Sequence, residues 1–592
     1  MPLGEFDVYL KKSTNKKTGR TYLSMVSNFW DSEKGYSRTK TLDSFGYLDE
    51  LEKVYEDPIA HFENVVAQHN LAEAQENAEF TITAAKNQQL KKNTNNRKNY
   101  GYIIIIKIIY QLGLPRFLIN RQQKTKIKSN TSAIMTLLLI SRILSPGSKK
   151  KAFDERKRYF DFDKKDTFKL HDIYRVLSHF AGLAEDIQLL INERITKYYG
   201  RNYNLIYYDV TNYYFEIDKE DDLRRKGFSK EHRPNPIVQM GLAMDADGLP
   251  ISYDLFPGNE SEKLHFRPMV YKLLNKYESG RVIAVADAAQ NTGNNVYYLD
   301  QGKQGYVFSQ SIRGGSKSFK NYVTNPSGYI WFGEKYKRKS RITRREIIVD
   351  FQRADGTTYK KKVLVDQRQI VFYSEKYAIR SREKREAAIL KAQRIIDNPS
   401  AYSKATSYGA LKYIENIQID KETGEIKASP KGIPCLNREV LIEEEKYDGY
   451  YSIVTNLFDE RENKGKYGDD QIIDIYRGLW RIEDSFRITK SDLEARPVYV
   501  SREDRIKAHF LICYIALVIM RLIQKHTDYK HSPEELAKAM NEISCSCEGG
   551  NLFLFDHRCD ISDDLGEAFG IDFTLLRLTR AEIKKNLGNV KK

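Results

Sequence analysis

The chain has 592 residues, several times the usual size of one domain, so three to five domains are expected. Apolar residues make up 41% and charged residues 30%, a balance that indicates a folded globular protein and excludes an intrinsically disordered one. The net charge is +17, from 97 basic and 80 acidic residues. This excess suits a protein that lies along a phosphate backbone, but a merely soluble basic protein would show it too.

Cysteine usage and the apolar runs indicate the compartment. Five cysteines are too few and too unevenly spaced for a disulfide framework, so a reducing cytosol is expected. The first residues, MPLGEFDVYLKK, have no apolar core and no cleavage site, so we expect no secretory signal. The longest apolar runs, near Ile134–Ile143 and Phe510–Met520, are about half a membrane span and predict buried core helices. We therefore expect a cytoplasmic protein without a membrane partner.

The first 200 residues predict a β-rich module followed by helices. Residues 5–55 alternate apolar and polar positions and are split by Lys/Gly turns. A helical stretch over about Pro58–Lys91 ends in the linker-like run KKNTNNRKN, and helical periods return from Tyr100 to about Tyr199. Basic clusters interrupt these helices, and either phosphate contacts or solvated charge would explain them: Arg121, Lys124, Lys126 and Lys128, then Lys149, Lys150 and Lys151.

At residue 203 the pattern changes to strands. NYNLIYYDVTNYYFE is rich in aromatic and β-branched residues, and IVQMGLAMDADGLPISYDLFPGN predicts two strands joined by the turn Asp247–Gly248. A helix (SEKLHFRPMVYKLLNKY), a strand (RVIAVAD), a second helix (NTGNNVYYLD) and a strand (QGYVFSQ) come next. Three strands in a meander followed by alternating helices and strands predict an α/β fold with a ribonuclease-H-like mixed sheet.

Residues 313–446 interrupt that order. They hold basic strands (EIIVDF, KKKVLVDQ, QIVFYS), a charged helix from Lys376 to Ile396 and polar loops, which predict an inserted β-rich domain. The strand GYYSIVTN and two helices, from Gln471 and from Ser501, then resume the core. The tail from about Thr527 is predicted to be helical, with a hairpin near Leu552–Phe555.

Two aspartates stand at informative places in the predicted sheet. Asp209 lies mid-strand on a face shared with Tyr207 and Thr211, where a charge is costly unless it is paired or bound to a metal. Asp287 closes the apolar strand VIAVAD, at the C-terminal strand end where open α/β sheets bind ligands. Either aspartate alone could also be a turn or helix cap.

The helix YRGLWRIEDSFRITKSDL is more specific. Tyr476, Glu483 and Lys490 are spaced by seven residues, and each step is only about 20° short of two full turns, so all three are predicted to share one face. Leu479 and Phe486 belong to the apolar side. The alternative is an exposed polar face with no partner.

These stretches resemble the DDE transposases of bacterial insertion sequences. More narrowly, the sequence is similar to the group with a β-insertion and a Tyr-x2-Arg-x3-Glu-x6-Lys (YREK) signature that holds the third carboxylate. The resemblance covers about residues 200–525, and the N-terminal half is similar to that of one subfamily. The matching stretches are YYDVTNYYFE, QMGLAMDADGLPISYDLFPGN, VIAVADAAQNTGNN, DGYYSIVTN and YRGLWRIEDSFRITKSDLEARPVYV.

The resemblance implies a metal-binding catalytic triad of Asp209, Asp287 and Glu483, with Tyr476 and Lys490 on the transposon-end phosphates. The expected domains are 1–95, a β-rich module and linker helix; 96–200, a helical DNA-binding domain; 201–312, the first part of the core; 313–446, the β-rich insertion; 447–525, the second part of the core; and 526–592, a C-terminal helical region. The signature's arginine is replaced by Leu479, and three arginines are alternatives for its role: Arg477, Arg481 and Arg487.

Phosphodiester cleavage and joining need an activated oxygen nucleophile and charge relief on the leaving oxygen, which two hard cations supply. Carboxylates suit Mg²⁺ or Mn²⁺, so we expect two such ions, with Asp209 shared between them, Asp287 on one and Glu483 on the other. The expected partners are the double-stranded DNA of the terminal inverted repeats and of the target. A homodimer is expected in that complex, on the nucleoid of a bacterium.

Three further features leave alternatives open. Cys545-x-Cys547 and His557-x-Cys559 have irregular spacing, and we do not expect them to bind structural zinc. His509 lies on a strongly apolar helix and is predicted to be a packing residue. Trp331 and the basic run Lys335–Arg345 either stack on an extruded base beside phosphates or belong to the scaffold.

The sequence is also compatible with two competing functions. One is a metal-dependent nuclease of the same fold that cuts DNA but never joins it. The other is a catalytically inactive DNA-binding regulator, although an intact acidic triad argues against it.

Overall fold

The computed structural model describes residues 8–592 except 17, 32–35, 77–88, 90–91, 93–95, 163–167, 228–234, 278, 403–406, 408, 420–424, 431, 459–466 and 550. Its contacts divide the chain into two units, Met1–Leu90 and Lys91–Lys592.

The N-terminal unit is a three-stranded antiparallel sheet covered by a helix. The strands β1 (Val8–Thr14), β2 (Thr21–Asp31) and β3 (Tyr36–Tyr47) pair in sequence order. The short helix α1 (Leu48–Leu51) and the longer α2 (Pro58–Glu76) follow. Val8 and Met25 pack against Val66 of α2, so alternate strand positions form the small core and the predicted β-module is confirmed.

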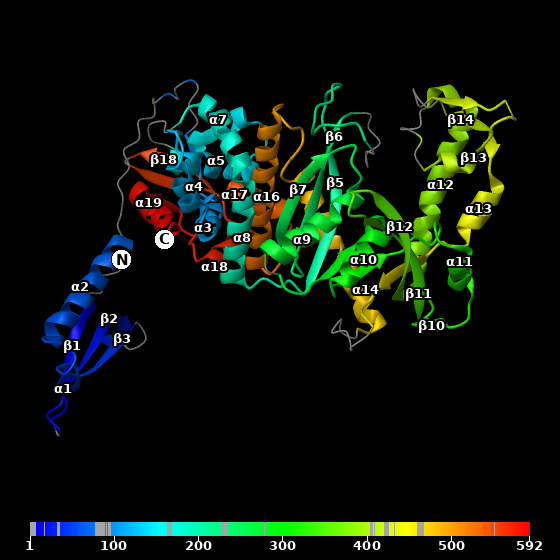
Figure 1. Cartoon of the computed structure of the whole chain (residues 1–592). Helices are drawn as coiled ribbons and strands as arrows, with labels where there is room; N and C mark the ends of the chain where they lie inside the picture. Colours follow the sequence, from blue (N-terminus) through cyan, green and yellow to red (C-terminus); the bar gives the residue numbers. More distant parts are fainter. Residues whose placement is uncertain are drawn as a thin grey trace. The chain divides into compact units, whose positions relative to one another are not determined.

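A helical region begins the second unit, as the sequence predicts. Its long apolar helix α16 (Glu503–His526) packs against several of the other helices and also against the central sheet (Figure 1). The other helices of this region are α3 (Ile103–Gln111), α4 (Leu114–Gln122), α5 (Thr131–Leu144), α6 (Lys149–Glu155), α7 (Leu170–Gly182), α8 (Ala184–Tyr199), α17 (Pro533–Glu542), α18 (Asp560–Phe569) and α19 (Arg580–Asn589).

Among the described residues, α16 is the one single helix that is long and apolar enough to cross a membrane, and the bent pair α3–α4 passes the same test as a unit. The apolar window of α16 is 94% buried inside the protein. Its apolar surface is therefore covered by protein, which confirms that the run Phe510–Met520 lies in a core helix.

A small sheet joins distant parts of the chain beside these helices. The predicted hairpin is β18 (Ser544–Gly549) and β19 (Leu552–Phe555), flanked by β4 (Arg97–Asn99) and β20 (Arg577–Thr579) in the order β20-β19-β18-β4. The pairing of β18 with β4 connects the start of this unit to its end.

The central sheet has nine strands in the order β10-β11-β12-β17-β9-β8-β5-β6-β7. β5, β6 and β7 form an antiparallel meander, β5, β8 and β9 are parallel neighbours, and β17 is antiparallel to β9. This is the predicted ribonuclease-H-like mixed sheet. Its strands are β5 (Leu205–Tyr214), β6 (Ile237–Met244), β7 (Pro250–Pro257), β8 (Ile283–Ala286), β9 (Gly305–Ser309), β10 (Ile330–Trp331), β11 (Tyr336–Gln352), β12 (Thr358–Ser374) and β17 (Tyr450–Thr455).

The two faces of the sheet are covered by different helices. Helices α9 (Phe266–Lys276) and α10 (Gly293–Gln301) pack on the face that carries Tyr208 and Val210. Helices α14 (Asp469–Arg477), α15 (Trp480–Lys490) and α16 pack on the opposite face, which carries Tyr207 and Tyr213. Strand alternation thus sorts the residues of β5 between two cores.

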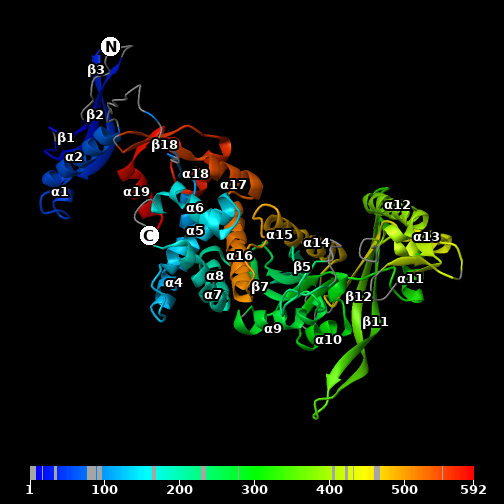
Figure 2. The same cartoon turned by 90° about the horizontal axis from the view of Figure 1, so that it is seen from above.

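The long strands of the predicted insertion belong to the central sheet. β11 and β12 form a hairpin that continues the sheet through β17, and its tip extends away from the other strands (Figure 2). KKKVLVDQ and QIVFYS lie in one strand, β12, because pairing with β11 is unbroken from Thr358 to Ser374.

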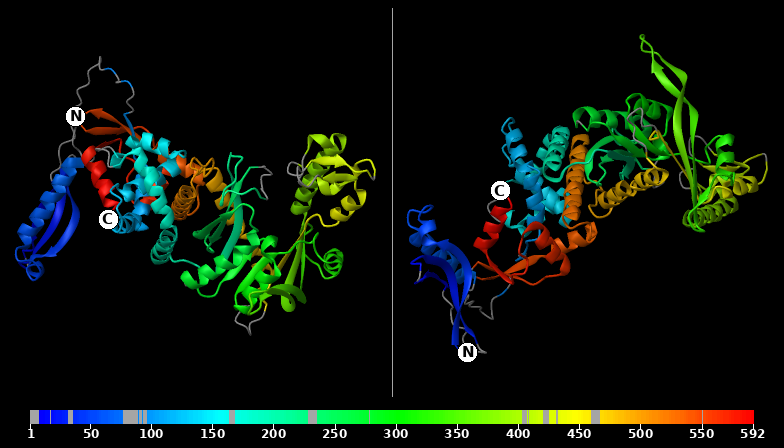
Figure 3. Two further views of the ribbon diagram at one scale, coloured as in Figure 1. Left: turned by 45° about the horizontal axis from the view of Figure 1, so that its top comes forward. Right: turned by 90° about the horizontal axis from the view of Figure 1, so that it is seen from below.

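A small lobe follows the hairpin (Figure 3). The predicted charged helix is α12 (Glu375–Asp397), whose Ala392 and Ile395 form a separate core with Tyr413. The rest of the lobe and the element before the hairpin are β13 (Ile414–Glu415), β14 (Ile417–Ile419), β15 (Ile426–Ala428), β16 (Cys435–Leu436), α13 (Arg438–Glu445) and α11 (Lys317–Thr324). The 3₁₀ turns of the chain are η1 (Arg156–Arg158), η2 (Phe160–Phe162), η3 (Glu262–Leu264), η4 (Ala288–Gln290), η5 (Pro399–Ala401) and η6 (Leu411–Tyr413).

Candidate active site

Asp209 and Asp287 lie on neighbouring parallel strands. β5 pairs with β8 in a register that sets Tyr207 opposite Val285. Asp287 directly follows β8 with extended backbone angles, φ −71° and ψ 171°. Continuing the register by two residues therefore places Asp287 beside Asp209, at the roughly 5 Å spacing of adjacent strands.

Both aspartates belong to the face of the sheet that α14 and α15 cover. Tyr207 and Val285, two residues before each aspartate, are buried in the core beneath these helices. Residues of β8 alternate between the two cores in the same way. Strand alternation hence assigns Asp209 and Asp287 to one side of the sheet.

A tyrosine from α14 holds the carboxylate of Asp287. The Tyr476 hydroxyl donates to Asp287 Oδ1 over 2.9 Å and lies 2.7 Å from the hydroxyl of Tyr451 on β17. Burial, the Asp287 charge and Tyr451 raise the pKa of Tyr476 well above its ordinary value, while a hydrogen bond with Ser309 opposes this. Tyr476 therefore stays protonated and donates to the carboxylate. Asp209 Oδ1 accepts from the backbone N–H of Val210 over 2.7 Å.

The predicted single helix is in fact two helices, so the prediction that Tyr476, Glu483 and Lys490 share one helix face is wrong for Tyr476. α14 ends at Arg477, and Gly478 and Leu479 form tighter turns with i→i−3 hydrogen bonds before α15 begins. A Cβ on Gly478 would lie 2.0 Å from the Tyr207 hydroxyl oxygen, so the backbone meets β5 where only glycine fits. The even 100° spacing from Tyr476 to Glu483 is lost at this break.

Glu483 and Lys490 still share a face because both lie within α15. Glu483 is exposed in the first turn, and Lys490 is partly buried with its Nζ 5.5 Å from the centre of the Tyr213 ring. α15 packs along β5, the strand of Asp209, and Leu479 at the break is buried at 5% exposure. The placement of Leu479 on the apolar side is confirmed.

The three candidate arginines have different partners. Arg477 pairs with Asp474 within its own helix, at 3.1 Å between nitrogen and oxygen. Arg487 pairs with Asp484 and Asp492 at 3.0 and 3.2 Å. Arg481 instead lies beside Tyr207. Burial raises the pKa of Tyr207, and the charge and hydrogen bond of Arg481 lower it. Arg481 is the candidate that adjoins the strand of Asp209.

Sequence reasoning did not select three residues that line this region. Tyr207 contacts Gly478, Tyr451 contacts Tyr476, and Ser309 hydrogen-bonds to both Tyr451 and Tyr476. All three lie on strands identified from sequence, but their role depends on contacts with helices more than 20 residues away along the chain. The aromatic pair before Asp209, in YYDVT, is the one local signal.

The donor chemistry of Asp209 and Asp287 fits a divalent cation. Mg²⁺ is commonly bound through one or two carboxylates plus substrate phosphates, and two aspartates on adjacent strands supply that set. Across the part of the chain that the structure describes, no three His, Cys, Asp or Glu side chains form a group that could hold a metal. Glu483 is therefore not assembled with the two aspartates in one such group.

The other candidates lie elsewhere. Cys545 is buried on β18, which raises its pKa to about 12, and His557 pairs with Glu542 at 3.2 Å. Cys547 and Trp331 are exposed.

His509 is a buried packing residue, as predicted, with its Nδ1 2.6 Å from Lys149 Nζ and its Nε2 2.8 Å from the carbonyl oxygen of Ala495. Lys149 is only 2% exposed, so the expectation that it belongs to a solvated or phosphate-binding cluster is wrong: its ammonium group turns inward to the histidine.

Fold and site together define a ribonuclease-H-like protein with acidic residues on the central strands of its sheet. A family model described as Transposase DDE domain matches residues 215–519, and one described as IS1634 family transposase, N-terminal domain, matches residues 10–79. The first covers more than half of the chain, so the protein belongs to the DDE transposases of bacterial insertion sequences. Asp287 and Glu483 lie inside that match, and Asp209 lies just before it.

Two solved structures are similar over part of the chain. One is the Mos1 transposase paired-end complex with the left transposon end, at 11% identity and a TM-score of 0.14, covering 41% of this chain and 66% of that one. The other is the Mos1 mariner paired-end complex with Mn, at 12% identity and a TM-score of 0.13, covering 41% and 67%. The match thus covers about two thirds of each of these two chains. No curated protein matches it.

Proposed function

We propose that the protein is a transposase that nicks the ends of its own element and joins the freed 3′-hydroxyl to target DNA. The observation that carries this proposal is the pairing of β5 with β8, which brings Asp209 beside Asp287 under the helix pair that bears Glu483. Membership of the DDE transposases supports it.

Two Mg²⁺ or Mn²⁺ ions would be held by these carboxylates, Asp209 on both, Asp287 on one and Glu483 on the other. When bound, such ions activate the attacking oxygen and relieve charge on the leaving one. Tyr476 fixes the direction of the Asp287 carboxylate through its 2.9 Å hydrogen bond to Oδ1, which would orient Oδ2 as the metal ligand.

DNA is the proposed partner. The net charge of +17 favours phosphate contact over a large surface. Lys490, on the face of Glu483, is proposed to contact a phosphate of the cleaved end, and Tyr476 to lie beside the same strand. Arg481 is favoured for the role of the missing signature arginine because it adjoins Tyr207. We propose a homodimer in the DNA complex, on the bacterial nucleoid.

The test uses purified protein and duplex DNA carrying the inverted repeats that bracket the gene. Asp209→Asn, Asp287→Asn and Glu483→Gln should each abolish nicking and joining while DNA affinity stays nearly unchanged. Mn²⁺ should raise the melting temperature of the wild type but not of the two aspartate variants. The control is Asp254→Asn, which removes a carboxylate that pairs with Lys272 of α9 at 2.9 Å, and it should remain active. Full cleavage by any triad variant would remove that residue from the site.

Two further assays separate the competing functions. A substrate with pre-cut ends reports joining alone, so a protein that cuts but cannot join these ends is a nuclease. A protein that binds the ends yet neither cuts nor joins them is a regulator.

A further inference from the structure

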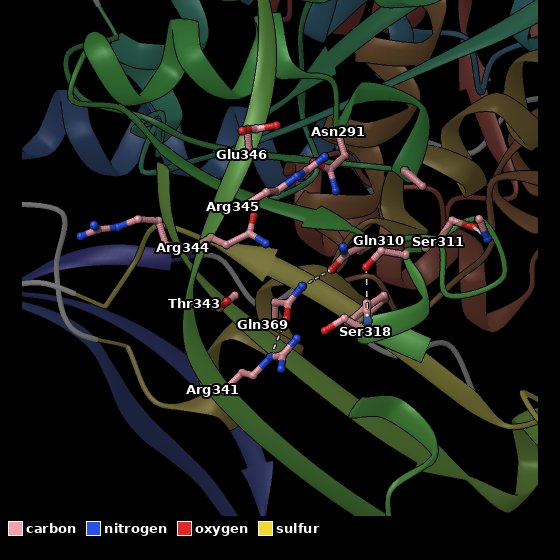
Figure 4. Close-up of a pocket in the computed structure, with 16 residues that line it drawn as sticks. Asn291, Gln310, Ser311, Ser318, Arg341, Thr343, Arg344, Arg345, Glu346 and Gln369 are labelled. Carbon is pink, nitrogen blue, oxygen red and sulfur yellow. Dashed lines mark hydrogen bonds between the residues drawn. The ribbon is translucent and has the colours of Figure 1, made fainter. Parts of the chain in front are cut away.

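A second polar site lies next to Asp287. A pocket of about 530 Å³ opens between η4, the segment before α11 and the strands β11 and β12 (Figure 4). Ala288 and Asn291, just after Asp287, form part of its wall. Asn291 also donates to the backbone oxygen of Ser309 over 3.1 Å, and Ser309 hydrogen-bonds to Tyr476. The pocket and the proposed active site therefore share one wall.

Two arginines in the pocket lack a carboxylate partner. Arg341 Nε donates to Gln369 over 2.9 Å, and Arg345 donates to Asn291 over 2.8 Å. Both side chains are partly buried, and among the described residues neither forms an ion pair. Arg344, between them, points away from both in Figure 4 and pairs with Asp366 at 3.0 Å. The Arg341 guanidinium lies 3.8 Å from the centre of the Tyr322 ring, but neither arginine pairs with a carboxylate among the described residues. A partly buried cation that lacks a negatively charged partner favours an anionic ligand.

A buried amide without a partner also lines the pocket. Gln367 lies opposite Thr343 in the β11–β12 ladder and is 1% exposed. Neither its nitrogen nor its oxygen has a hydrogen-bond partner in the described part of the chain. Buried side-chain amides are rarely left unpaired, because the lost hydrogen bonds destabilise the fold. The unpaired amide of Gln367 therefore indicates that a ligand supplies its missing hydrogen-bond partner.

Hydrogen bonds already orient the side-chain amides of Gln369 and Gln310 in the pocket. Arg341 donates to Gln369, and Gln369 donates to Gln310 over 3.0 Å. This chain of hydrogen bonds fixes the guanidinium before any ligand arrives, which lowers the entropy cost of binding.

We propose that this pocket binds one backbone phosphodiester of the DNA strand that passes Asp287, with Arg341 and Arg345 as its charge partners and the Gln367 amide as a neutral donor. The inference rests on the proposed function, because it takes DNA to be the substrate. It adds a fixed phosphate position on the Asp287 side of the site. A phosphodiester matches the guanidinium geometry. Among the described residues that line the pocket, the one carboxylate, that of Glu346, is already paired with Lys362 at 2.9 Å.

The experiment is a neutral-linkage scan on the element-end duplex. Single methylphosphonates replace each phosphate near the cleavage position in turn, and affinity is measured by fluorescence anisotropy with EDTA present. For the wild type, one linkage on the Asp287 side should weaken binding about tenfold. Arg341→Gln should weaken binding to unmodified DNA by a similar factor but lose nothing more at that one linkage. Arg344→Gln, on the same strand and with the same charge change, should behave as the wild type does.

Gln367→Leu provides a second measurement that a purely structural role would not produce. The variant should melt at a higher temperature than the wild type, because an unpaired buried amide is gone, yet bind the end more weakly. A lower melting temperature with unchanged affinity would contradict the assignment of Gln367.

The outcomes separate this inference from the proposed function. If the wild type binds and cuts the ends but Arg341→Gln shows the same scan as Arg344→Gln, the pocket is not a phosphate site and the transposase proposal stands. If the wild type shows no affinity for the ends at all, both fail together.

Discussion

Substituting Gly478 by alanine should test how the third carboxylate is placed. The added Cβ would lie 2.0 Å from the Tyr207 hydroxyl oxygen, 2.6 Å from Tyr207 Cζ and 3.0 Å from an Arg481 nitrogen. The two distances to Tyr207 are shorter than real Cβ contacts, so either the tyrosine or the helix pair has to move. Glu483 stands five residues further on, so a shift of α15 would move it relative to β5, the strand of Asp209.

Two opposing terms set the expected magnitude. Gly478 has ordinary helical angles, φ −56° and ψ −13°, so alanine alone would stabilise it by about 0.5–1 kcal/mol. Overpacking against a buried tyrosine costs about 1–3 kcal/mol. We expect a net loss of about 1–2 kcal/mol in the free energy of unfolding. Tyr207→Phe should recover part of it in the double variant, since the hydroxyl is removed while Cζ remains close.

Urea unfolding gives the stability, and a nicking assay on element-end DNA gives the activity at a temperature where every variant is folded. Gly588→Ala is the matched control, because this helical glycine of α19 has nothing within 4 Å of its Cβ position and alanine should be neutral or stabilising. If Gly478→Ala unfolds at the same urea concentration as Gly588→Ala and nicks DNA normally, the contact with β5 does not position Glu483.

Four other substitutions test three separate parts of the structure. Leu479→Ala should lower the free energy of unfolding by about 2–5 kcal/mol because it leaves a cavity at a buried position. Lys490→Ala should leave stability intact and slow joining. The reverse pattern in melting and joining assays would mean that the buried and exposed faces of α15 are assigned wrongly. Tyr476→Phe removes the donor to Asp287 and should slow cleavage by about 10–100-fold with little change in DNA affinity, so equal cleavage rates would deny it a positioning role. Burial lowers the pKa of Lys149 to about 7 from 10.5, so the unfolded chain binds more protons between these values and stability should rise with pH across that window. Lys149→Met should flatten this rise in denaturant titrations, and an unchanged slope would show that another group causes it.

Local pattern was enough to predict much of the sheet. The strand NYNLIYYDVTNYYFE is β5, and the Asp247–Gly248 turn joins β6 to β7, with Gly248 at the positive φ of 82° that such a turn requires. Alternation and turn chemistry act over a few residues, so the sequence displays them directly. The order of helices and strands then predicted the fold class.

Long-range contacts decided what the sequence could not show. The helix breaks at Gly478, where the Tyr207 side chain of β5 leaves no room for a Cβ, whereas a lone glycine inside a helical pattern is usually tolerated and does not predict a break. The inward turn of Lys149 depends on His509, 360 residues further along the chain. Gln367, whose amide has no hydrogen-bond partner among the described residues, lines a pocket formed with segments more than 20 residues away along the chain. None of these follows from local composition.

Different interactions position the three carboxylates, so substitutions in different places should affect cleavage and DNA binding differently. Asp209 and Asp287 are placed by the backbone ladder between β5 and β8, which side-chain changes leave intact. Glu483 is placed by packing of α15, at the Gly478 contact and through the buried Arg521, which donates to the neighbouring Asp484 at 2.9 Å. Substitutions along the α15–β5 contact should therefore reduce cleavage more than binding. Substitution of Arg341 in the β11 pocket should reduce binding more than cleavage, because its hydrogen bond goes to Gln369 and not to the Asn291, Ser309 and Tyr476 contacts behind Asp287.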